Sequence, residues 1–171
     1  MKSRNVVLSV GVVVALSGCA KDEPRAVAAA ESSKAEAAQP AATLASTASG
    51  PKVTVYKTPS CGCCVKWVDH LKEHGFTVET MDMPDLSMVK HKYLVADELE
   101  SCHTAVVGDY VIEGHVPADV IQKLLKEKQA VLGLAVPGMP MGSPGMEGAI
   151  KEKYDILTFD RAGTTTVYAQ R

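Results

Sequence analysis

Three cysteines within four residues are the feature of this sequence that most directly indicates chemistry. They form the segment Cys61-Gly62-Cys63-Cys64. Cys61 and Cys64 have the spacing of a thiol-disulfide pair, which works where a strand meets a helix because the helix N-terminus stabilises a thiolate. Cys63 is unusual in that setting, since a third thiol invites disulfide scrambling. Three thiolates at one helix end suit a soft metal ion instead.

Cys102 supplies a fourth thiol, and four thiols permit two arrangements other than a copper site. In an oxidising compartment they could form two structural disulfides. Adjacent Cys63 and Cys64 pair poorly with each other, however, and disulfides from three cysteines within four residues would cross-link a whole domain poorly. They could also bind zinc, for which a shell of four cysteines is common, although zinc fingers normally use two separated C-x-x-C pairs. Both arrangements stay open as alternatives.

Copper is favoured over zinc by soft donors elsewhere in the chain. Thiolates and thioethers select Cu(I). A segment rich in proline and glycine, residues 136–146, contains Met139, Met141 and Met146. The segment is too irregular to pack one face of a helix, so these methionines are candidate ligands, although methionine also fills gaps in protein cores.

Among the five histidines, His103 is the strongest candidate ligand because it directly follows Cys102. His115 receives less weight, since it lies at the far end of an expected strand, and His91 has no other candidate ligand around it. The predicted metal-site residues are therefore Cys61, Cys63, Cys64, Cys102, His103, Met139, Met141 and Met146.

The elements that must position these residues alternate between strands and helices. Apolar and polar residues alternate over 52–57, which predicts a strand, and Thr58-Pro59-Ser60 ends it just before the cysteines. Apolar residues then recur at helical spacing from about 63 to 74, until Gly75. The later patterns predict a strand at 76–81, a short helix at 85–91, a helical or irregular stretch at 93–100, a hairpin of 104–107 and 110–115, a helix at 117–126, and a second hairpin of 154–159 and 165–169.

This order of elements resembles the thioredoxin-like fold. We therefore expect an α/β (α+β) domain with a mixed sheet, to which the second hairpin is added at the C-terminus. In thioredoxin-like folds the loop that enters the strand at 104 faces the C-x-x-C turn and usually carries a cis-proline. Here Ser101-Cys102-His103 stands in that loop. The resemblance therefore implies that the sulfur of Cys102 and the imidazole of His103 lie near the other three cysteines.

The N-terminus has the three regions of a secretory signal. Lys2 and Arg4 precede an apolar run from 6 to 15, and Leu16-Ser17-Gly18-Cys19 follows. The run is too short to span a bilayer. Leu-Ser-Gly-Cys resembles a bacterial lipobox, which implies cleavage before Cys19 and attachment of lipid to its sulfur. Ala20 in the next position resembles the pattern of lipoproteins sorted to an outer membrane.

Composition separates the chain into three parts. Residues 1–18 are the expected signal peptide. Residues 19–50 contain the lipidated cysteine and then mostly Ala, Ser, Glu, Thr and Pro, which cannot bury a core and predict a disordered tether. Residues 51–171 are the expected thioredoxin-like metal-binding domain. With 18 basic and 20 acidic residues, the chain has a net charge of −2 and no basic patch that indicates a nucleic-acid partner.

Several separated motifs together resemble the CopG-type family of bacterial envelope metal-binding proteins, long described as a domain of unknown function. The resemblance covers residues 52 to 171 and rests on the segments 58–64, 100–104, 113–117 and 136–146. It implies a thioredoxin-like domain, a role in copper resistance, and copper held in a cysteine-bridged cluster by residues that correspond to Cys61, Cys63, Cys64 and Cys102.

Two hypotheses of function follow. The first is copper binding and detoxification on the periplasmic side of the cell envelope by a lipid-anchored protein, which interconverts Cu(I) and Cu(II) and hands metal to other envelope copper-handling proteins. The rival is a thiol-disulfide oxidoreductase in which Cys61 is the exposed nucleophile and Cys64 resolves the mixed disulfide. The sequence leaves open whether the protein is an enzyme.

Overall fold

The computed structural model describes residues 50–171. The expected signal peptide, the lipobox at Cys19 and most of the expected tether lie outside these residues. The strands are β1 (Lys52–Lys57), β2 (Thr77–Asp82), β3 (His103–Val107), β4 (Tyr110–Glu113), β5 (Gly133–Ala135), β6 (Asp155–Phe159) and β7 (Thr165–Gln170). The helices are α1 (Gly62–Glu73), α2 (Ser87–Lys92) and α3 (Ala118–Glu127), with a short 3-10 helix η1 (Asp97–Leu99).

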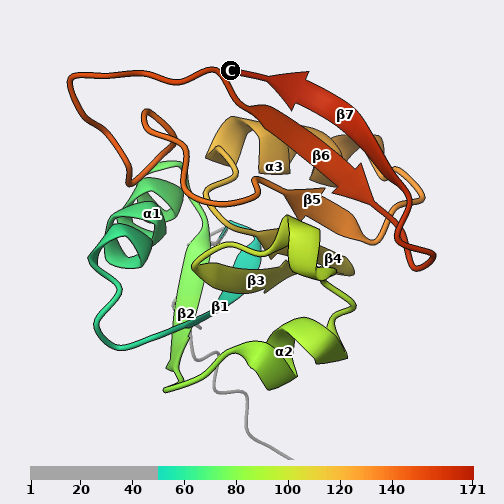
Figure 1. Cartoon of the computed structure of the whole chain (residues 1–171), viewed down its shortest axis with the longest axis horizontal. Helices are drawn as coiled ribbons and strands as arrows, with labels where there is room; N and C mark the ends of the chain where they lie inside the picture. The colour runs from blue at the N-terminus through green and yellow to red at the C-terminus, as the bar shows by residue number, and fades with distance from the viewer. Residues whose placement is uncertain (1–49) are drawn as a thin grey trace, which may run out of the picture. The chain divides into compact units, whose positions relative to one another are not determined.

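All the described strands join one mixed sheet in the order β2-β1-β3-β4-β5-β6-β7 (Figure 1). β1 pairs in parallel with β2 and antiparallel with β3, and β3 pairs antiparallel with β4. The first four strands with α1, α2 and α3 give the βαβαββα order expected for a thioredoxin-like fold. The predicted fold class, an α+β domain with a mixed sheet, is confirmed.

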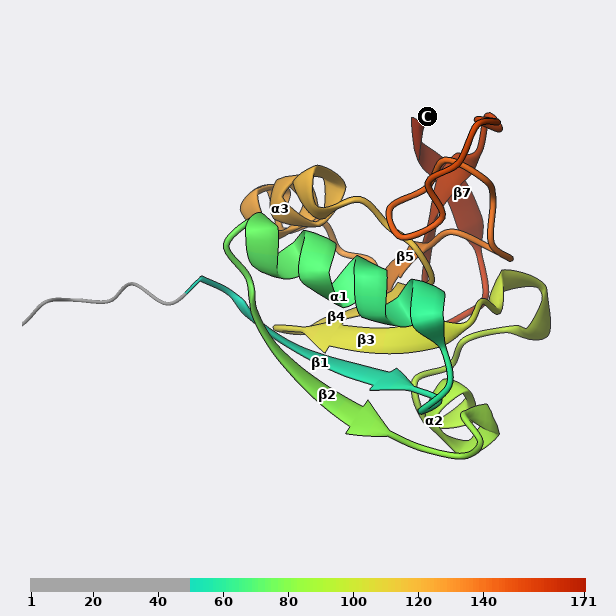
Figure 2. The ribbon, with the colours of Figure 1, turned by 90° about the vertical axis from the view of Figure 1, so that its left-hand side faces the viewer.

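Two helices cover one face of this sheet. Figure 2 shows α1 and α3 side by side over the strands, with α2 on the opposite side. Their buried side chains meet those of the central strands in the main core, where Trp67 and Ile121 are fully buried. Trp67 also donates a 2.9 Å hydrogen bond from Nε1 to the carbonyl oxygen of Val116, as a buried indole N–H requires. This bond fixes α1 against the segment that leads into α3.

The predicted C-terminal hairpin is present, and a short strand connects it to the sheet. β6 and β7 pair antiparallel, and β5 lies between β4 and β6. β5 was not predicted. Its three residues lie in the apolar run 131–136, which shows no alternation because β5 is fully buried. Such a run fits a buried strand as well as a loop or a helix segment.

The remaining differences from prediction concern boundaries. α2 begins at Ser87, two residues later than expected, because Asp85 accepts hydrogen bonds from the backbone and the hydroxyl of Ser87 and forms the turn that precedes the helix. The stretch 93–100 is irregular apart from η1. Within residues 50–171, no helix is both long and apolar enough to span a membrane.

Candidate metal centre

Three of the four cysteines lie on the first turn of α1. β1 ends at Lys57 and the chain turns through Thr58-Pro59-Ser60. Cys61 is the N-cap of α1, and its Sγ accepts a 3.3 Å hydrogen bond from the backbone N–H of Cys64. The first turn carries no acidic side chain, so the positive end of the helix dipole is free to stabilise negative sulfur.

Cys102 reaches this turn from the other side, on the loop that enters β3. Its Sγ lies 3.5 Å from that of Cys64 and 3.9 Å from that of Cys63. The Sγ atoms of Cys61 and Cys63 are 3.4 Å apart. All four sulfurs lie within 4.8 Å of one another. The structure thus brings the four predicted cysteines together.

Two of these cysteines are oxidised. Cys61 and Cys64 form a disulfide, whereas Cys63 and Cys102 are free thiols. The alternative of two structural disulfides is therefore wrong for the described residues. Cys64 is fully buried and Cys61 is partly exposed, which is the asymmetry expected of a resolving and an attacking thiol.

His115 adds a nitrogen to the four sulfurs. Its Nε2 lies 2.9 Å from Sγ of Cys102, and its Nδ1 lies 2.7 Å from the carbonyl oxygen of Pro144. Because a carbonyl oxygen only accepts hydrogen bonds, Nδ1 carries the proton and the lone pair of Nε2 faces the thiols. A metal-binding histidine is usually oriented in this way, by a hydrogen bond from its other nitrogen to a carbonyl or a carboxylate.

His103, the predicted imidazole, is fully buried beside the sulfurs. Its Nδ1 lies 3.3 Å from Sγ of Cys102, and its Nε2 has no hydrogen-bond partner. Its ring packs against Trp67 and His115, with centroids 4.3 Å and 5.0 Å away. Cys102, His103 and His115 thus form a second potential ligand group that shares its sulfur with the first.

Burial disfavours charge on these groups when no cation is bound. Burial, together with the charge of neighbouring Cys63, raises the pKa of Cys102 to about 12. Burial also lowers the pKa of His115, and it lowers the pKa of His103 well below its ordinary value, helped by the charges of His115 and Lys90. A bound cation would stabilise the thiolate of Cys102 and displace its proton. Metal binding would therefore release protons.

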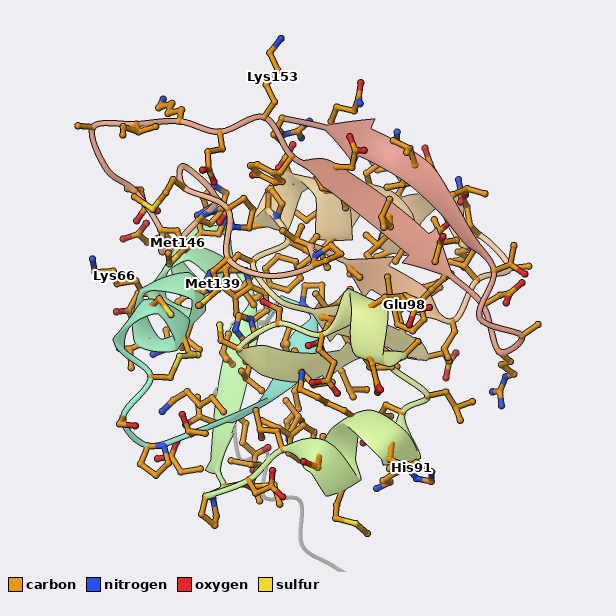
Figure 3. The ribbon with its side chains drawn as sticks, viewed as in Figure 1. Lys66, His91, Glu98, Met139, Met146 and Lys153 are labelled. Carbon is orange, nitrogen blue, oxygen red and sulfur yellow. A yellow bond between two sulfur atoms is a disulfide. The ribbon has the colours of Figure 1, made fainter. Side chains whose placement is uncertain are left out.

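The methionine-containing segment 136–146 lies over the first turn of α1. Met141 and Met146 line a pocket of about 370 Å³ together with Cys63 and Lys66, and Figure 3 shows Met146 and Lys66 close together beside α1. Met139 is half exposed and is not among the residues that line this pocket. Two of the three predicted methionines therefore lie near a cluster thiol.

A glycine allows this segment to approach α1 closely. Gly145 has a φ of +87°, and a Cβ atom there would lie 2.6 Å from the carbonyl oxygen of Cys63 and 3.0 Å from the backbone nitrogen of Trp67. Only glycine tolerates both conditions. The neighbouring carbonyl of Pro144 is the one that orients His115, so the approach of the segment also sets the direction of Nε2.

His115, the less favoured of the two imidazoles in the sequence, has the nitrogen nearer to Cys102, and the predicted hairpin indicates why. β3 and β4 are joined at Gly108-Asp109, and Thr104 pairs with Glu113. Extending this register by two residues sets Cys102 opposite His115. Residues directly opposite one another in an antiparallel pair have neighbouring side chains. Register, rather than closeness in the sequence, identifies the nearer imidazole nitrogen.

Comparisons with known proteins found one family model and two similar solved structures. A family model described as "Protein of unknown function, DUF411" matches residues 99–146. Two solved structures, described as "Copper resistance protein copG- Form 1" and "Copper resistance protein copG- Form 2", are each 41% identical to the chain with a TM-score of 0.67. Each match covers 71% of this chain and 98% of the other. No curated protein matches the chain.

Proposed function

This chain belongs to the CopG family of copper resistance proteins, and on that premise we propose that it binds copper through Cys61, Cys63, Cys64 and Cys102. The observation that carries the proposal is the convergence of the four sulfurs within 4.8 Å. We propose His115 as a fifth ligand because its Nε2 lone pair faces Cys102, and His103 as a further candidate because its buried Nε2 has no partner.

Copper, rather than zinc, suits this donor set. Thiolates and thioethers are soft ligands that select Cu(I), and Met141 and Met146 line the pocket that adjoins Cys63. We propose that these two thioethers contact Cu(I) on the open side of the site and that Met139, which is half exposed and does not line this pocket, does not. Zinc remains the alternative metal because a Cys₄ shell also satisfies its tetrahedral preference.

The spacing of the sulfurs bears on how many copper ions the site holds. A single ion with metal–sulfur bonds of about 2.3 Å holds its sulfurs roughly 3.8 Å apart. The Cys61–Cys63, Cys64–Cys102 and Cys63–Cys102 separations of 3.4 to 3.9 Å are similar, whereas Cys61 and Cys64 are bonded to each other and must be reduced before both can bind metal as thiolates. The same compactness suits thiolates that bridge several Cu(I) ions. Following the family resemblance, we propose a cysteine-bridged cluster of several ions, which a copper-to-protein ratio well above one would support.

Redox exchange between copper and cysteine is part of the proposal. Two Cu(II) ions can each accept one electron from the thiolates of Cys61 and Cys64, which gives two Cu(I) ions and the Cys61–Cys64 disulfide. The presence of this disulfide in the structure supports such a two-electron state. In the disulfide state only Cys63 and Cys102 would be left as thiolates to hold Cu(I). The reverse reaction would return the thiolates of Cys61 and Cys64 and Cu(II), so the site would interconvert the two copper oxidation states.

We place this activity in the cell envelope. The leader and the lipobox-like Leu16-Ser17-Gly18-Cys19 support a protein that is lipid-anchored through Cys19 and faces the periplasm. Metabolic labelling with a fatty acid tests this. The wild-type protein should be labelled and should fractionate with membranes, and Cys19→Ser should abolish both; an unlabelled wild-type protein would contradict the anchor.

A thiol-disulfide oxidoreductase is the second candidate, and the Cys61–Cys64 disulfide is the observation that favours it. In that mechanism the thiolate of Cys61 attacks a partner's disulfide, and Cys64 then attacks Cys61. The products are the Cys61–Cys64 disulfide and two partner thiols. This cycle needs neither Cys102 nor His115.

The test is metal analysis of wild-type protein and Cys102→Ser, both purified reduced and without air. The copper hypothesis predicts several coppers per wild-type chain and thiols that react only after a chelator is added. Cys102→Ser should lose most of this copper. The oxidoreductase hypothesis predicts a wild-type protein that refuses Cu(I), while both proteins reduce a model disulfide at similar rates. Zinc that resists exchange for Cu(I) would instead support the zinc alternative.

A further inference from the structure

A buried ion pair lies behind the loop that carries Cys102. Lys90 of α2 and Glu113 at the end of β4 are in contact through Nζ and Oε1, and their side chains are 7% and 0% exposed. Burying an isolated charge is costly, and a buried pair often gives no net gain in stability over apolar residues of similar size. This pair therefore calls for an explanation other than stability.

The pair holds both peptide groups of Ser101, the residue before Cys102. Glu113 Oε1 accepts a 2.6 Å hydrogen bond from the backbone N–H of Ser101, and Lys90 Nζ donates a 3.0 Å hydrogen bond to its carbonyl oxygen. Glu113 Oε2 accepts a 2.6 Å hydrogen bond from the hydroxyl of Thr104. Ser101 and Thr104, which flank Cys102-His103, are thus both hydrogen-bonded to the carboxylate of Glu113.

The backbone around Ser101 is restrained from another side as well. The hydroxyl of Ser101 donates a hydrogen bond to the carbonyl oxygen of Gly138. Gly114 has a φ of +72°, and a Cβ atom there would lie 2.5 Å from Oγ of Ser101. β4 and the methionine-containing segment therefore both pack against Ser101. The loop has little freedom to move without breaking hydrogen bonds to charged groups that are themselves buried, and such bonds are stronger than neutral ones.

From this geometry we infer that Lys90 and Glu113 are positioning residues for Cys102. They hold Ser101 and Thr104 so that Cys102 faces Cys63 and Cys64 before any metal arrives. Neither side chain is proposed as a ligand. The inference rests on the proposed function and specifies how the fourth thiol is pre-organised, which raises affinity because less order has to be imposed on binding.

Paired substitutions separate positioning from stability. Lys90→Met with Glu113→Leu removes both charges together, so no unpaired charge is left buried, and it also removes the acceptor of the Ser101 N–H. Lys90→Met with Glu113→Gln removes the same charges but keeps a side-chain carbonyl as acceptor. Leu124→Ala, at a fully buried core position of α3, is the control that lowers stability and leaves the hydrogen bonds of Lys90 and Glu113 to Ser101 in place.

Cu(I) affinity, measured by competition with a chromophoric chelator, is the first readout. We expect the leucine double variant to bind Cu(I) about tenfold or more weakly, a loss typical of removing groups that orient metal ligands, and to have an altered copper–thiolate absorption band. The glutamine double variant should lose clearly less affinity, and Leu124→Ala should melt earlier with wild-type affinity. The inference is overturned if the leucine double variant binds like wild type, if the glutamine variant loses as much as the leucine variant, or if Leu124→Ala loses the same affinity.

Amide hydrogen exchange of the metal-free wild-type protein is a second readout that does not depend on whether any variant folds. The Ser101 amide should exchange at least a hundredfold more slowly than in an unstructured peptide, because Glu113 accepts its hydrogen bond inside the protein. Exchange at the unstructured rate would overturn the positioning role. Failure of the wild-type protein to bind Cu(I), with the Ser101 amide still protected, would instead count against the proposed function alone.

Discussion

Nε2 of His115 lies 2.9 Å from Sγ of Cys102, and the two residues lie opposite one another at the open end of the β3–β4 hairpin. Both residues lie just beyond the paired part of the hairpin, which ends at Thr104 and Glu113, and the carbonyl of Pro144 sets the orientation of the ring. The pair connects the sulfur cluster on α1 to the segment that covers it.

Replacing His115 should weaken copper binding more than replacing a histidine outside the site. His115→Gln removes the nitrogen that faces Cys102, and we expect a Cu(I) affinity about tenfold or more lower, with a change in the copper–thiolate absorption spectrum. The matched control is His91→Gln, because His91 is exposed on α2 and is labelled in Figure 3 away from Met146. Equal affinities of the two variants would show that His115 takes no part in the site.

The methionines should divide into two classes. Met146→Leu and Met141→Leu each remove a thioether from the pocket that adjoins Cys63, and both should weaken Cu(I) binding or slow its uptake. Leucine preserves the volume and costs little in packing. Met139→Leu is the control and should behave like wild type in stopped-flow uptake of Cu(I). An effect of Met139→Leu equal to that of Met146→Leu would contradict the assignment.

Acid should destabilise the metal-free protein in a way that depends on His103. In the unfolded chain this imidazole has its ordinary pKa of 6.5, whereas burial lowers the pKa in the folded protein. Below about pH 6.5 the unfolded state therefore binds more protons, and the free energy of unfolding falls as the pH decreases toward the folded-state pKa.

Denaturant unfolding at pH 7.5 and pH 5.5 measures this effect. His103→Phe removes the titrating group and the unpartnered buried Nε2, so the difference in stability between the two pH values should shrink. Glu113, whose burial raises its pKa, titrates in both proteins, and its effect cancels in the comparison. An unchanged pH dependence in His103→Phe would assign the acid sensitivity to another group.

Gly145→Ala should loosen the segment that covers the cysteines. The substitution adds a left-handed backbone penalty of about 1–2 kcal/mol, and its Cβ atom would also lie 2.6 Å from the carbonyl oxygen of Cys63. Gly138→Ala is matched to it, since Gly138 also has a positive φ of +68° but no atom within 4 Å of an added Cβ.

We expect Gly145→Ala to lower the free energy of unfolding by more than Gly138→Ala does and to weaken copper binding as well. Thermal melting of the metal-free proteins and Cu(I) competition measure the two effects. If Gly138→Ala proves the more harmful substitution, the close approach of residues 143–146 to α1 is not what stabilises this segment.

The sequence by itself determined the local elements and the first three donors. Alternation over residues 52–57, the break at Thr58-Pro59-Ser60 and the helical spacing after it reflect short-range preferences, and they set three thiols on one helix turn wherever that helix packs. The order of elements also predicted the mixed sheet and the C-terminal hairpin. It did not show β5, because a strand buried on both faces has no polar residues to mark its period.

Only the tertiary structure decided which distant groups join the cysteines. Cys102 meets Cys64 because β3 pairs with β1, and His115 approaches Cys102 through the hairpin register. Met141 and Met146 line the pocket beside Cys63 and Met139 does not, because the segment that carries them is irregular and has no periodicity from which this could be predicted. No sequence pattern singles out Lys90 or Glu113 as buried, and charged side chains are seldom buried. Their burial depends on long-range packing, which brings each charge its partner and which no local pattern encodes.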